Sequence, residues 1–220
     1  MRALVVGSSG GIGAAIVADL KGRGWEVTGL SRSEDGLDVT DEASVKTVVR
    51  RCEGPFELVF VATGALVSGI ERPEKSIREI TAEELTAQHR INAVGPMMVL
   101  KYALPLIPRD RRAVFAALSA RVGSIGDNRL GGWHSYRASK AGLNQLLHGA
   151  AIELARTHPQ MIVAALHPGT VATPFTEAYA ASHTRTAPGE AARALVDVVE
   201  GLSPEASGGF FDYAGKPIPW

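Results

Sequence analysis

Short runs of apolar and β-branched residues alternate with longer segments of helical periodicity along most of the 220-residue chain. This alternation is typical of a parallel sheet whose connecting helices cover both faces. The expected strands are Ala3–Val6, Glu26–Leu30, Leu58–Val61, Ala113–Leu118, Met161–Leu166 and Gly209–Asp212. The expected helices are Ile12–Lys21, Glu42–Arg51, Ala82–Ile107, Tyr136–Thr157 and Glu190–Val199. The sequence therefore predicts an α/β fold.

The expected helix Ala82–Ile107 carries its own boundary signals. Thr81 followed three residues later by Glu84 forms a capping box at its start. Gly95-Pro96 inside it predicts a kink or break. No internal repeat and no linker rich in Pro, Gly or Ser divides the chain, so we expect one domain spanning residues 1–220.

Composition narrows the expected partners to small molecules. The 23 basic and 23 acidic side chains give no net charge, so we expect neither nucleic acid nor an anionic membrane as a partner. No apolar run approaches the length of a membrane span, and the apolar run at the start of the sequence is too short for a signal peptide. The single cysteine, Cys52, and the six histidines form no metal-ligand spacing, which predicts no metal and a reducing cytoplasm.

A glycine-rich turn connects the first expected strand to the first helix. It reads Gly7-Ser8-Ser9-Gly10-Gly11-Ile12-Gly13. Such a turn lets the backbone approach a pyrophosphate, while the helix N-terminus favours negative charge. The spacing differs from the common Gly-x-Gly-x-x-Gly fingerprint. We interpret the turn as a phosphate site; a tight turn that binds nothing is the alternative.

The end of the second strand favours NADP over NAD. An acidic residue there binds a ribose 2′-hydroxyl, whereas an arginine accepts a 2′-phosphate. This chain has Ser31 where an acid is expected, with Arg32 beside it. The alternative is that Arg32 is an ordinary solvated loop residue.

Tyr136 and Lys140 lie four residues apart, a spacing that places both on one face of a helix. A tyrosine hydroxyl with a pKa near its ordinary value of about 10 exchanges protons poorly near neutral pH. A lysine, together with a second cation such as an oxidised nicotinamide ring, would lower that pKa. A chance surface pair is the simpler reading of the spacing alone.

Four motifs in order make the chain resemble the short-chain dehydrogenase/reductase family over nearly its whole length. They are Gly7-xxx-Gly11-x-Gly13, Asn92, Tyr136-xxx-Lys140 and Pro168-Gly169-Thr170-Val171-Ala172-Thr173. Three further segments resemble the branch of C-factor and Sniffer-type carbonyl reductases, namely Arg121–Asn128, Gly131-Gly132-Trp133 and Pro217–Trp220.

The resemblance implies a single-domain Rossmann-type, doubly wound parallel sheet of about seven strands. It also implies NADPH-dependent hydride transfer between nicotinamide and a small carbonyl or alcohol substrate. In that reading Tyr136 is the general acid or base, Lys140 holds the nicotinamide ribose, and Asn92 anchors a water that links Lys140 to solvent. Cofactor contacts are then expected from these three residues, Asn92, Tyr136 and Lys140, and from Gly7, Ser8, Ser9, Gly11, Ile12, Gly13, Arg32, Asp38, Val39, Ala62, Gly64, Pro168, Gly169, Val171 and Thr173.

One residue departs from the family's pattern. The family uses a serine that hydrogen-bonds the substrate oxygen, and Ala120 stands at that place. Ser119 is expected to point to the opposite side of the strand, because side chains alternate. Ser124, in the following loop, is a second candidate, and no serine at all is the third.

Other residues near the expected site have two interpretations each. His134 and His167 either contact substrate or simply pack, and Trp133 and Trp220 either cover an apolar substrate or belong to the core. The segment Pro174–Pro188 is expected to be a substrate lid.

We expect an NADPH-dependent oxidoreductase; a nucleotide-binding sensor with the same fold is the alternative that Ala120 supports. The family resemblance implies a homodimer or homotetramer built on the two long helices.

Overall fold

A computed structural model describes residues 1–179 and 185–220 of the chain. Its described residues form one parallel sheet of six strands in the order β2-β1-β3-β4-β5-β6. The strands are β1 (Arg2–Val6), β2 (Glu26–Leu30), β3 (Leu58–Val61), β4 (Ala113–Leu118), β5 (Met161–His167) and β6 (Phe210–Asp212). The predicted α/β fold is confirmed, and every expected strand lies within one residue of its predicted ends.

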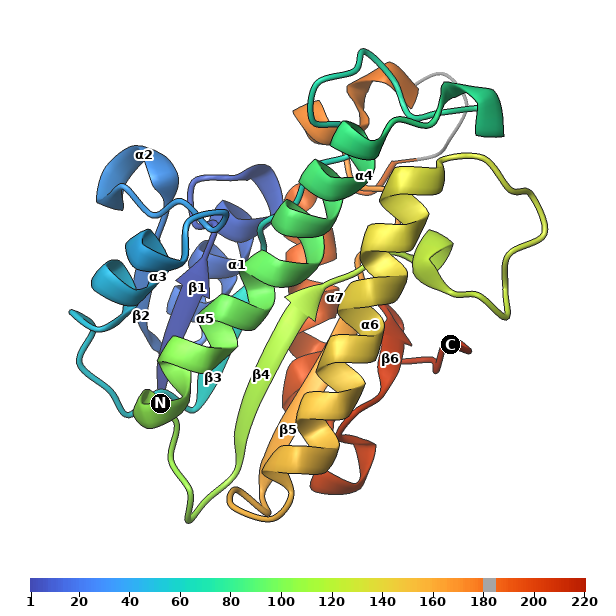
Figure 1. The fold of residues 1–220 in the computed structure, drawn as a ribbon. Helices are drawn as coiled ribbons and strands as arrows, with labels where there is room; N and C mark the ends of the chain where they lie inside the picture. Colours follow the sequence, from blue (N-terminus) through green and yellow to red (C-terminus); the bar gives the residue numbers. More distant parts are fainter. Residues whose placement is uncertain (180–184) are drawn as a thin grey trace.

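Helices cover both faces of this sheet (Figure 1). The helices are α1 (Gly11–Gly22), α2 (Arg32–Asp35), α3 (Glu42–Val49), α4 (Ala82–His89), α5 (Gly95–Ala103), α6 (His134–Leu154) and α7 (Pro188–Gly201). Helices α3, α5 and α6 pack on one face, and α1 and α7 pack on the other. The doubly wound arrangement therefore follows the prediction.

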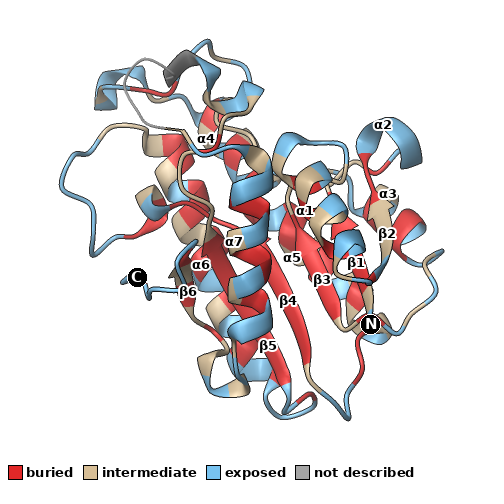
Figure 2. Ribbon diagram, turned by 180° about the vertical axis from the view of Figure 1, so that it is seen from behind, coloured by how far each residue is buried: buried red, intermediate tan, exposed pale blue. Residues whose placement is uncertain are grey.

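The core continues through the sheet because its central strands are buried on both sides (Figure 2). In β4, alternate residues belong to different clusters. Phe115 packs on the face covered by α6, while Val114 and Leu118 pack on the face covered by α7. A strand covered on both faces needs an apolar residue at every position, which explains the unbroken run Ala113–Leu118.

The sheet has six strands in the described part of the chain, whereas the family resemblance implies about seven. Here only the six residues 32–37 separate Ser31 from Asp38, and four of them form α2. A parallel crossover needs a dozen or more residues, so this segment is too short to return another strand.

The long helix expected over Ala82–Ile107 is broken, as Gly95-Pro96 predicts. Helix α4 passes through a π-helical turn, Arg90–Val94, into α5, which begins at Gly95. Only half of the predicted capping box forms: Thr81 Oγ1 accepts the Glu84 amide at 3.1 Å. The Glu84 carboxylate instead accepts hydrogen bonds from the Ser68 amide at 2.8 Å and from Gln88 Nε2 at 3.0 Å.

Among the described residues, no helix is long and apolar enough to cross a bilayer. The same residues contain no group of three or more His, Cys, Asp or Glu side chains placed to hold a metal ion. The absence of a metal and of a membrane partner stays a prediction.

Candidate active site

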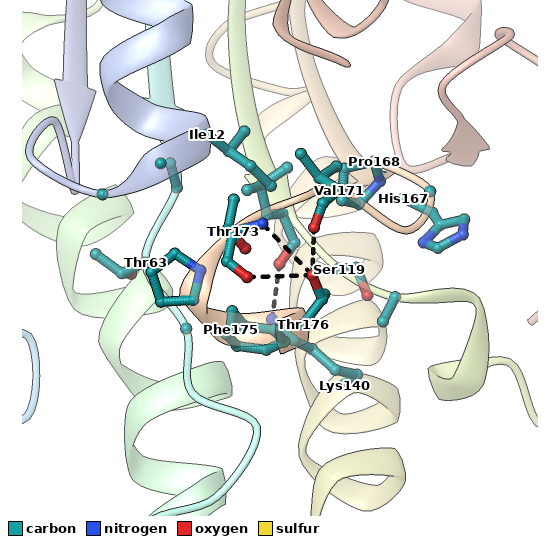
Figure 3. Close-up of a pocket in the computed structure, with 18 of the residues that line it drawn as sticks. Ile12, Thr63, Ser119, Lys140, His167, Pro168, Val171, Thr173, Phe175 and Thr176 are labelled. Atoms are coloured by element: carbon teal, nitrogen blue, oxygen red, sulfur yellow. Dashed lines mark hydrogen bonds between the residues drawn. The ribbon is translucent and has the colours of Figure 1, made fainter. Parts of the chain in front are cut away.

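The motifs recognised in the sequence meet at the carboxyl end of the sheet, around a pocket of about 340 Å³ that we call the inner pocket. In a parallel sheet the loops after all strands emerge at this end. Figure 3 shows Ile12 of the glycine turn facing Pro168, Val171 and Thr173 from the loop after β5, with Lys140 of α6 below. The inner pocket is lined by Gly10, Gly11, Ile12, Ala62, Thr63, Gly64, Leu118, Ser119, Ala120, Tyr136, Lys140, His167, Pro168, Gly169, Val171, Thr173, Pro174, Phe175 and Thr176.

The glycine turn brings the start of α1 close to the end of β1. Gly7 has φ +89°, a conformation that other residues rarely adopt. A Cβ at Gly13 would lie 2.1 Å from the Gly7 carbonyl oxygen, and one at Gly11 would lie 2.6 Å from Thr173 Cγ2. The missing side chain at Gly13 therefore lets α1 pack on the end of β1, and the one at Gly11 lets α1 approach the loop after β5.

The N-terminus of α1 fits a phosphate group. Its N-cap, Gly10, offers no side-chain cap, and the first turn contains no acidic residue. Within the described residues, the amides of Gly11, Ile12 and Gly13 have no acceptor. The Ser8 hydroxyl is buried without a partner. These donors and the helix dipole make the turn suited to a pyrophosphate.

A second pocket, of about 650 Å³, lies between the glycine turn and the end of β2 and is here called the β2 pocket. Arg32, Asp38 and Val39 all line it, as do Ala62 and Gly64. Two hydrogen bonds from Thr40 lower the pKa of Asp38, and the charges of Arg32 and Arg90 lower it further. Sequence reasoning missed Arg90, which reaches this pocket from the π-helical turn and donates to the Thr40 carbonyl at 2.8 Å.

Arg32 begins the short helix α2, and an acidic side chain lies near it. Ser31 caps this helix by accepting the Glu34 amide at 3.1 Å, while the Ser31 amide donates to Asp35 Oδ2 at 2.7 Å. The end of β2 therefore combines an arginine that lines the β2 pocket with a nearby carboxylate.

The first turn of α6 is capped from a distant loop. Its N-cap, Trp133, has φ 52° and makes no side-chain cap. The buried Glu74 carboxylate instead accepts from the Ser135 amide at 3.3 Å and from the Ser135 hydroxyl. This contact stabilises the helix terminus and fixes the start of the helix that carries Tyr136.

Tyr136 and Lys140 lie on one face of α6, as their spacing predicts. Both are buried, with 7% and 3% of their surface exposed. Lys140 Nζ donates to the Leu118 carbonyl at 2.8 Å and lies 5.8 Å from the centre of the Tyr136 ring. The pair therefore belongs to the inner pocket rather than to the protein surface.

Burial shifts both pKa values toward the neutral forms. It raises the pKa of Tyr136 and lowers that of Lys140 to about 7. The expectation that Lys140 lowers the tyrosine pKa is therefore not met by the chain's own groups. The reason is that the ammonium is itself desolvated and directed at a carbonyl. The second cation that the sequence analysis expects to lower the Tyr136 pKa, an oxidised nicotinamide ring, belongs to the cofactor.

Asn92 is completely buried in the π-helical turn and ties three segments together. Its Oδ1 accepts the Ala65 amide at 2.9 Å, and its Nδ2 donates to the Ala65 carbonyl at 2.8 Å. Nδ2 also contacts Gln88 Oε1 at 2.6 Å and Ser139 Oγ at 3.1 Å. A Cβ at Gly64 would lie 3.1 Å from Asn92 Oδ1 and 3.5 Å from Lys140 Nζ, so this glycine adjoins both polar groups.

Neither candidate serine offers a free hydroxyl to a substrate. Ser119 lines the inner pocket, but its hydroxyl donates to Asn144 Oδ1 at 2.6 Å. Ser124 lines neither the inner pocket nor the outer pocket described below; its hydroxyl donates to the Pro219 carbonyl and accepts the Asp127 amide. The geometry favours the third interpretation, in which no serine replaces the usual one at Ala120.

The outer pocket, of about 700 Å³, opens beside the inner one and shares Ala120, Tyr136, His167, Gly169, Phe175 and Thr176 with it. Its other lining residues are Leu66, Arg121, Val122, Asp127, Arg129, Leu130, Gly131, Trp133, Arg137 and Thr170. The rings of Trp133 and Phe175 lie 6.3 and 6.1 Å from the Tyr136 ring. Tyr136 thus stands between the two pockets, flanked by aromatic side chains.

The other residues singled out in the sequence differ in position. His167 lies at the end of β5, and its buried Nδ1 has no hydrogen-bond partner among the described residues. Burial, and then the charge of Arg121, lowers its pKa to about 4. His134 lines neither the inner nor the outer pocket, and Trp220 stacks on Phe210 instead of covering the site.

The expected lid Pro174–Pro188 includes residues 180–184, which lie outside the described part. Its beginning places Phe175 against Tyr136.

The chain is similar in sequence and in structure to known proteins. A family model described as short chain dehydrogenase matches residues 1–184. The 1-hydroxy-2-glutathionyl-2-methyl-3-butene dehydrogenase of Rhodococcus sp. (strain AD45) is 30% identical over 233 residues, covering 99% of this chain and 98% of that protein. The C-signal protein of Myxococcus xanthus is 33% identical over 170 residues, covering 77% and 95%. A solved structure of a short-chain dehydrogenase/reductase from Burkholderia multivorans with bound NADP has a TM-score of 0.85 and 28% identity, covering 100% of this chain and 99% of that one.

Proposed function

Because the chain belongs to the short-chain dehydrogenase family, we propose that it reduces a small carbonyl compound with NADPH, with Tyr136 as the proton donor. One observation carries this proposal: Tyr136 and Lys140 line the same pocket as the glycine turn and the loop after β5. The Rhodococcus relative is named as a dehydrogenase, and the Burkholderia structure holds NADP. Both support an oxidoreductase over a nucleotide-binding sensor.

The cofactor, when bound, supplies the hydride, and the chain's residues bind and orient it. The α1 amides and Ser8 are placed for the pyrophosphate, and Asp38 for the adenine amino group. Arg32 lines the β2 pocket and would hold the 2′-phosphate of NADP. The nicotinamide end is assigned to Pro168, Gly169, Val171 and Thr173, and the adenosine side to Gly7, Ser9, Val39, Ala62 and Gly64.

The proton is assigned to the Tyr136 hydroxyl. Burial raises the pKa of this group, so the chain by itself keeps the phenol protonated and able to donate. Lys140 holds the nicotinamide ribose from the same helix face. Asn92 and Lys140 both adjoin Gly64, and Asn92 is assigned the anchoring of a water that would link Lys140 to solvent.

Turnover and cofactor binding test these roles separately. A panel of small aldehydes and ketones is screened for NADPH oxidation by the wild-type protein. Tyr136→Phe is expected to lower kcat at least about a hundredfold with little change in cofactor affinity, since it removes only the hydroxyl. The matched control is Tyr102→Phe, whose hydroxyl bonds Glu42 on the surface. Unchanged turnover in Tyr136→Phe would contradict the mechanism.

Cofactor choice is tested at Arg32. Arg32→Ala is expected to reduce the ratio of kcat/KM for NADPH to that for NADH about tenfold or more, since it removes the cation of a charge-assisted pair. Asp35→Ala is expected to change the ratio in the opposite direction, because it removes the nearby carboxylate. An equal ratio in wild-type protein and Arg32→Ala would refute the NADP assignment.

We further propose that the protein acts in the cytoplasm as a homodimer or homotetramer. The turn before α5 and helix α6 expose apolar side chains, with Val94 36%, Leu146 38% and Ile152 64% accessible. Pairing of two copies would cover such a surface. Light scattering of the purified protein measures the number of copies, and a monomer at micromolar concentration would contradict this proposal.

A further inference from the structure

The outer pocket concentrates positive charge in a chain that is neutral overall. Arg121, Arg129 and Arg137 line it, and Asp127 is the one carboxylate among the lining residues that the structure describes. Among the described lining residues, three cations against one anion leave a formal charge of +2, and the Asp212 carboxylate 3.4 Å from Arg121 reduces the local excess to +1. His167 is neutral near pH 7, because burial lowers its pKa to about 4. The whole chain balances 23 basic against 23 acidic side chains. The outer pocket therefore carries an excess of positive charge that the chain as a whole does not have.

Two of these arginines, Arg121 and Arg137, differ in their partners. Arg121 is paired with two aspartates, whose carboxylate oxygens lie 3.0 and 3.4 Å from its guanidinium. Arg137 has no ion pair among the described residues. Its Nε donates to the Gly132 carbonyl at 2.9 Å and its Nη1 to the Val122 carbonyl at 3.1 Å. Arg137 is thus fixed by the backbone but not neutralised.

A guanidinium in this position favours an anion. Arg137 is half-buried, and burial alone lowers its pKa, with no carboxylate to offset the loss of solvent. Arginine remains charged at any physiological pH, so the partly desolvated charge persists. The two backbone contacts leave Nη2 without an acceptor in the described residues. A carboxylate fits such a donor through charge-assisted hydrogen bonds.

The position of Arg137 relates it to the reaction. It directly follows Tyr136 in α6, and both side chains line the outer pocket. The rest of that lining includes the apolar side chains of Leu66, Leu130 and Phe175. A substrate whose carbonyl oxygen meets Tyr136 would place its remaining atoms in this pocket, within reach of the unneutralised guanidinium.

We propose that Arg137 binds a carboxylate of the substrate, so that this protein reduces carbonyl compounds that carry a carboxylate group. Arg129, an exposed lining residue whose hydrogen bond within the described part of the chain goes to the neighbouring Asn128 carbonyl, adds a longer-range attraction. The inference rests on the proposed function, because it takes Tyr136 as the group that meets the carbonyl. It goes further by naming the substrate class and the residue that selects it.

A matched pair of probes tests the anion site. Reduction of 4-carboxybenzaldehyde and of methyl 4-formylbenzoate is measured with NADPH; the ester has the same ring and aldehyde, but a methyl group on its carboxyl oxygen removes the negative charge. We expect the wild-type protein to prefer the acid by about tenfold or more in kcat/KM, mainly through KM, as for a charge-assisted hydrogen bond. No preference for the acid would overturn the proposal.

Variants then locate the preference. Arg137→Gln is expected to lower kcat/KM for the acid about ten- to thirtyfold and to change that for the ester less than threefold. Arg137→Lys keeps the charge without the planar fork and is expected to retain part of the preference. The exposed control Arg156→Gln is expected to leave both values unchanged. An equal loss for acid and ester in Arg137→Gln would make Arg137 a structural clamp on the Val122 and Gly132 carbonyls and overturn the proposal.

Two further measurements keep the test decisive. If Arg137→Gln does not fold, Arg137→Lys decides, since an acid-to-ester ratio equal to that of the wild type would refute the assignment. If the wild type reduces neither probe, binding of both is measured by calorimetry. Acid binding that Arg137→Lys weakens would support the anion site while the proposed reductase function fails. Absence of acid binding by the wild type would refute the anion site itself.

Discussion

Replacing Lys140 by methionine is expected to stabilise the protein while removing its activity. Lys140 is 3% exposed, and burial lowers its pKa from 10.5 to about 7. At pH 6 this shift corresponds to a cost of about 5 kcal/mol for the buried charge. Methionine removes that cost but leaves the Leu118 carbonyl without its donor, a loss of about 1 kcal/mol. The variant should therefore be more stable at pH 6 by about 3 to 4 kcal/mol.

The sign of the pH dependence follows from the two pKa values. Between about 7 and 10.5 the unfolded chain binds more protons at this lysine than the folded chain, so wild-type stability rises with pH. At pH 9 the remaining cost is about 2 kcal/mol, and the advantage of Lys140→Met should shrink to about 1 kcal/mol.

Urea unfolding at pH 6, 7.5 and 9 without added cofactor measures this difference. Lys46→Met, an exposed residue of α3, is the matched control and should differ from the wild type by less than about 0.5 kcal/mol at each pH. The reasoning is refuted if Lys140→Met is less stable than the wild type at pH 6. It is equally refuted if the difference between the two proteins is the same at pH 6 and pH 9.

Three further predictions concern the same site. Gly64→Ala places a methyl group 3.1 Å from Asn92 Oδ1 and 3.5 Å from Lys140 Nζ, and is expected to lower kcat about tenfold or more with little loss of stability, as steady-state kinetics and urea unfolding would show. Ala120→Ser supplies the hydroxyl that the family uses, and is expected to raise kcat about tenfold or more in the NADPH assay; a decrease would mean that another donor already occupies this place. His167, with its pKa lowered from 6.5 to about 4, binds its proton more readily in the unfolded chain, so stability should fall as the pH drops from 6.5 to 4. Urea unfolding should show the wild type losing about 2 to 3 kcal/mol more than His167→Asn between pH 7.5 and pH 4.5.

The strands and the glycine turn could be predicted because their signals are local. An unbroken apolar run such as Ala113–Leu118 indicates a strand buried on both faces wherever it occurs. The need for glycine at Gly13 follows from how a helix packs on the strand before it. The absence of a further strand between Ser31 and Asp38 could also be predicted, because the six residues that separate them cannot hold a parallel crossover.

The contacts of individual polar side chains could not be predicted, because partners distant in sequence compete for them. Glu84 fits a capping box by its spacing, yet the Ser68 amide and Gln88 take its carboxylate. The sequence position of Ser124 suggests a substrate contact, yet its hydroxyl donates to the Pro219 carbonyl. Arg90 and Arg137 gave no sequence signal, because their roles depend on which loops meet at the carboxyl end of the sheet.

The start of α6 carries its charges against the usual rule for helix stability. The positive end of a helix dipole favours acidic side chains, yet Arg137 and Lys140 lie in the first two turns of α6. Their hydrogen bonds go to backbone carbonyls, and neither has an ion pair in the described part of the chain. Glu74, the acidic side chain that caps this end, bonds Ser135 rather than either cation. An arrangement that costs stability and leaves two basic side chains at adjoining pockets is suited to ligands that bring negative charge. A substrate whose carboxylate binds Arg137 should therefore increase the free energy of unfolding of the protein, and the Arg137→Gln variant should lose this increase.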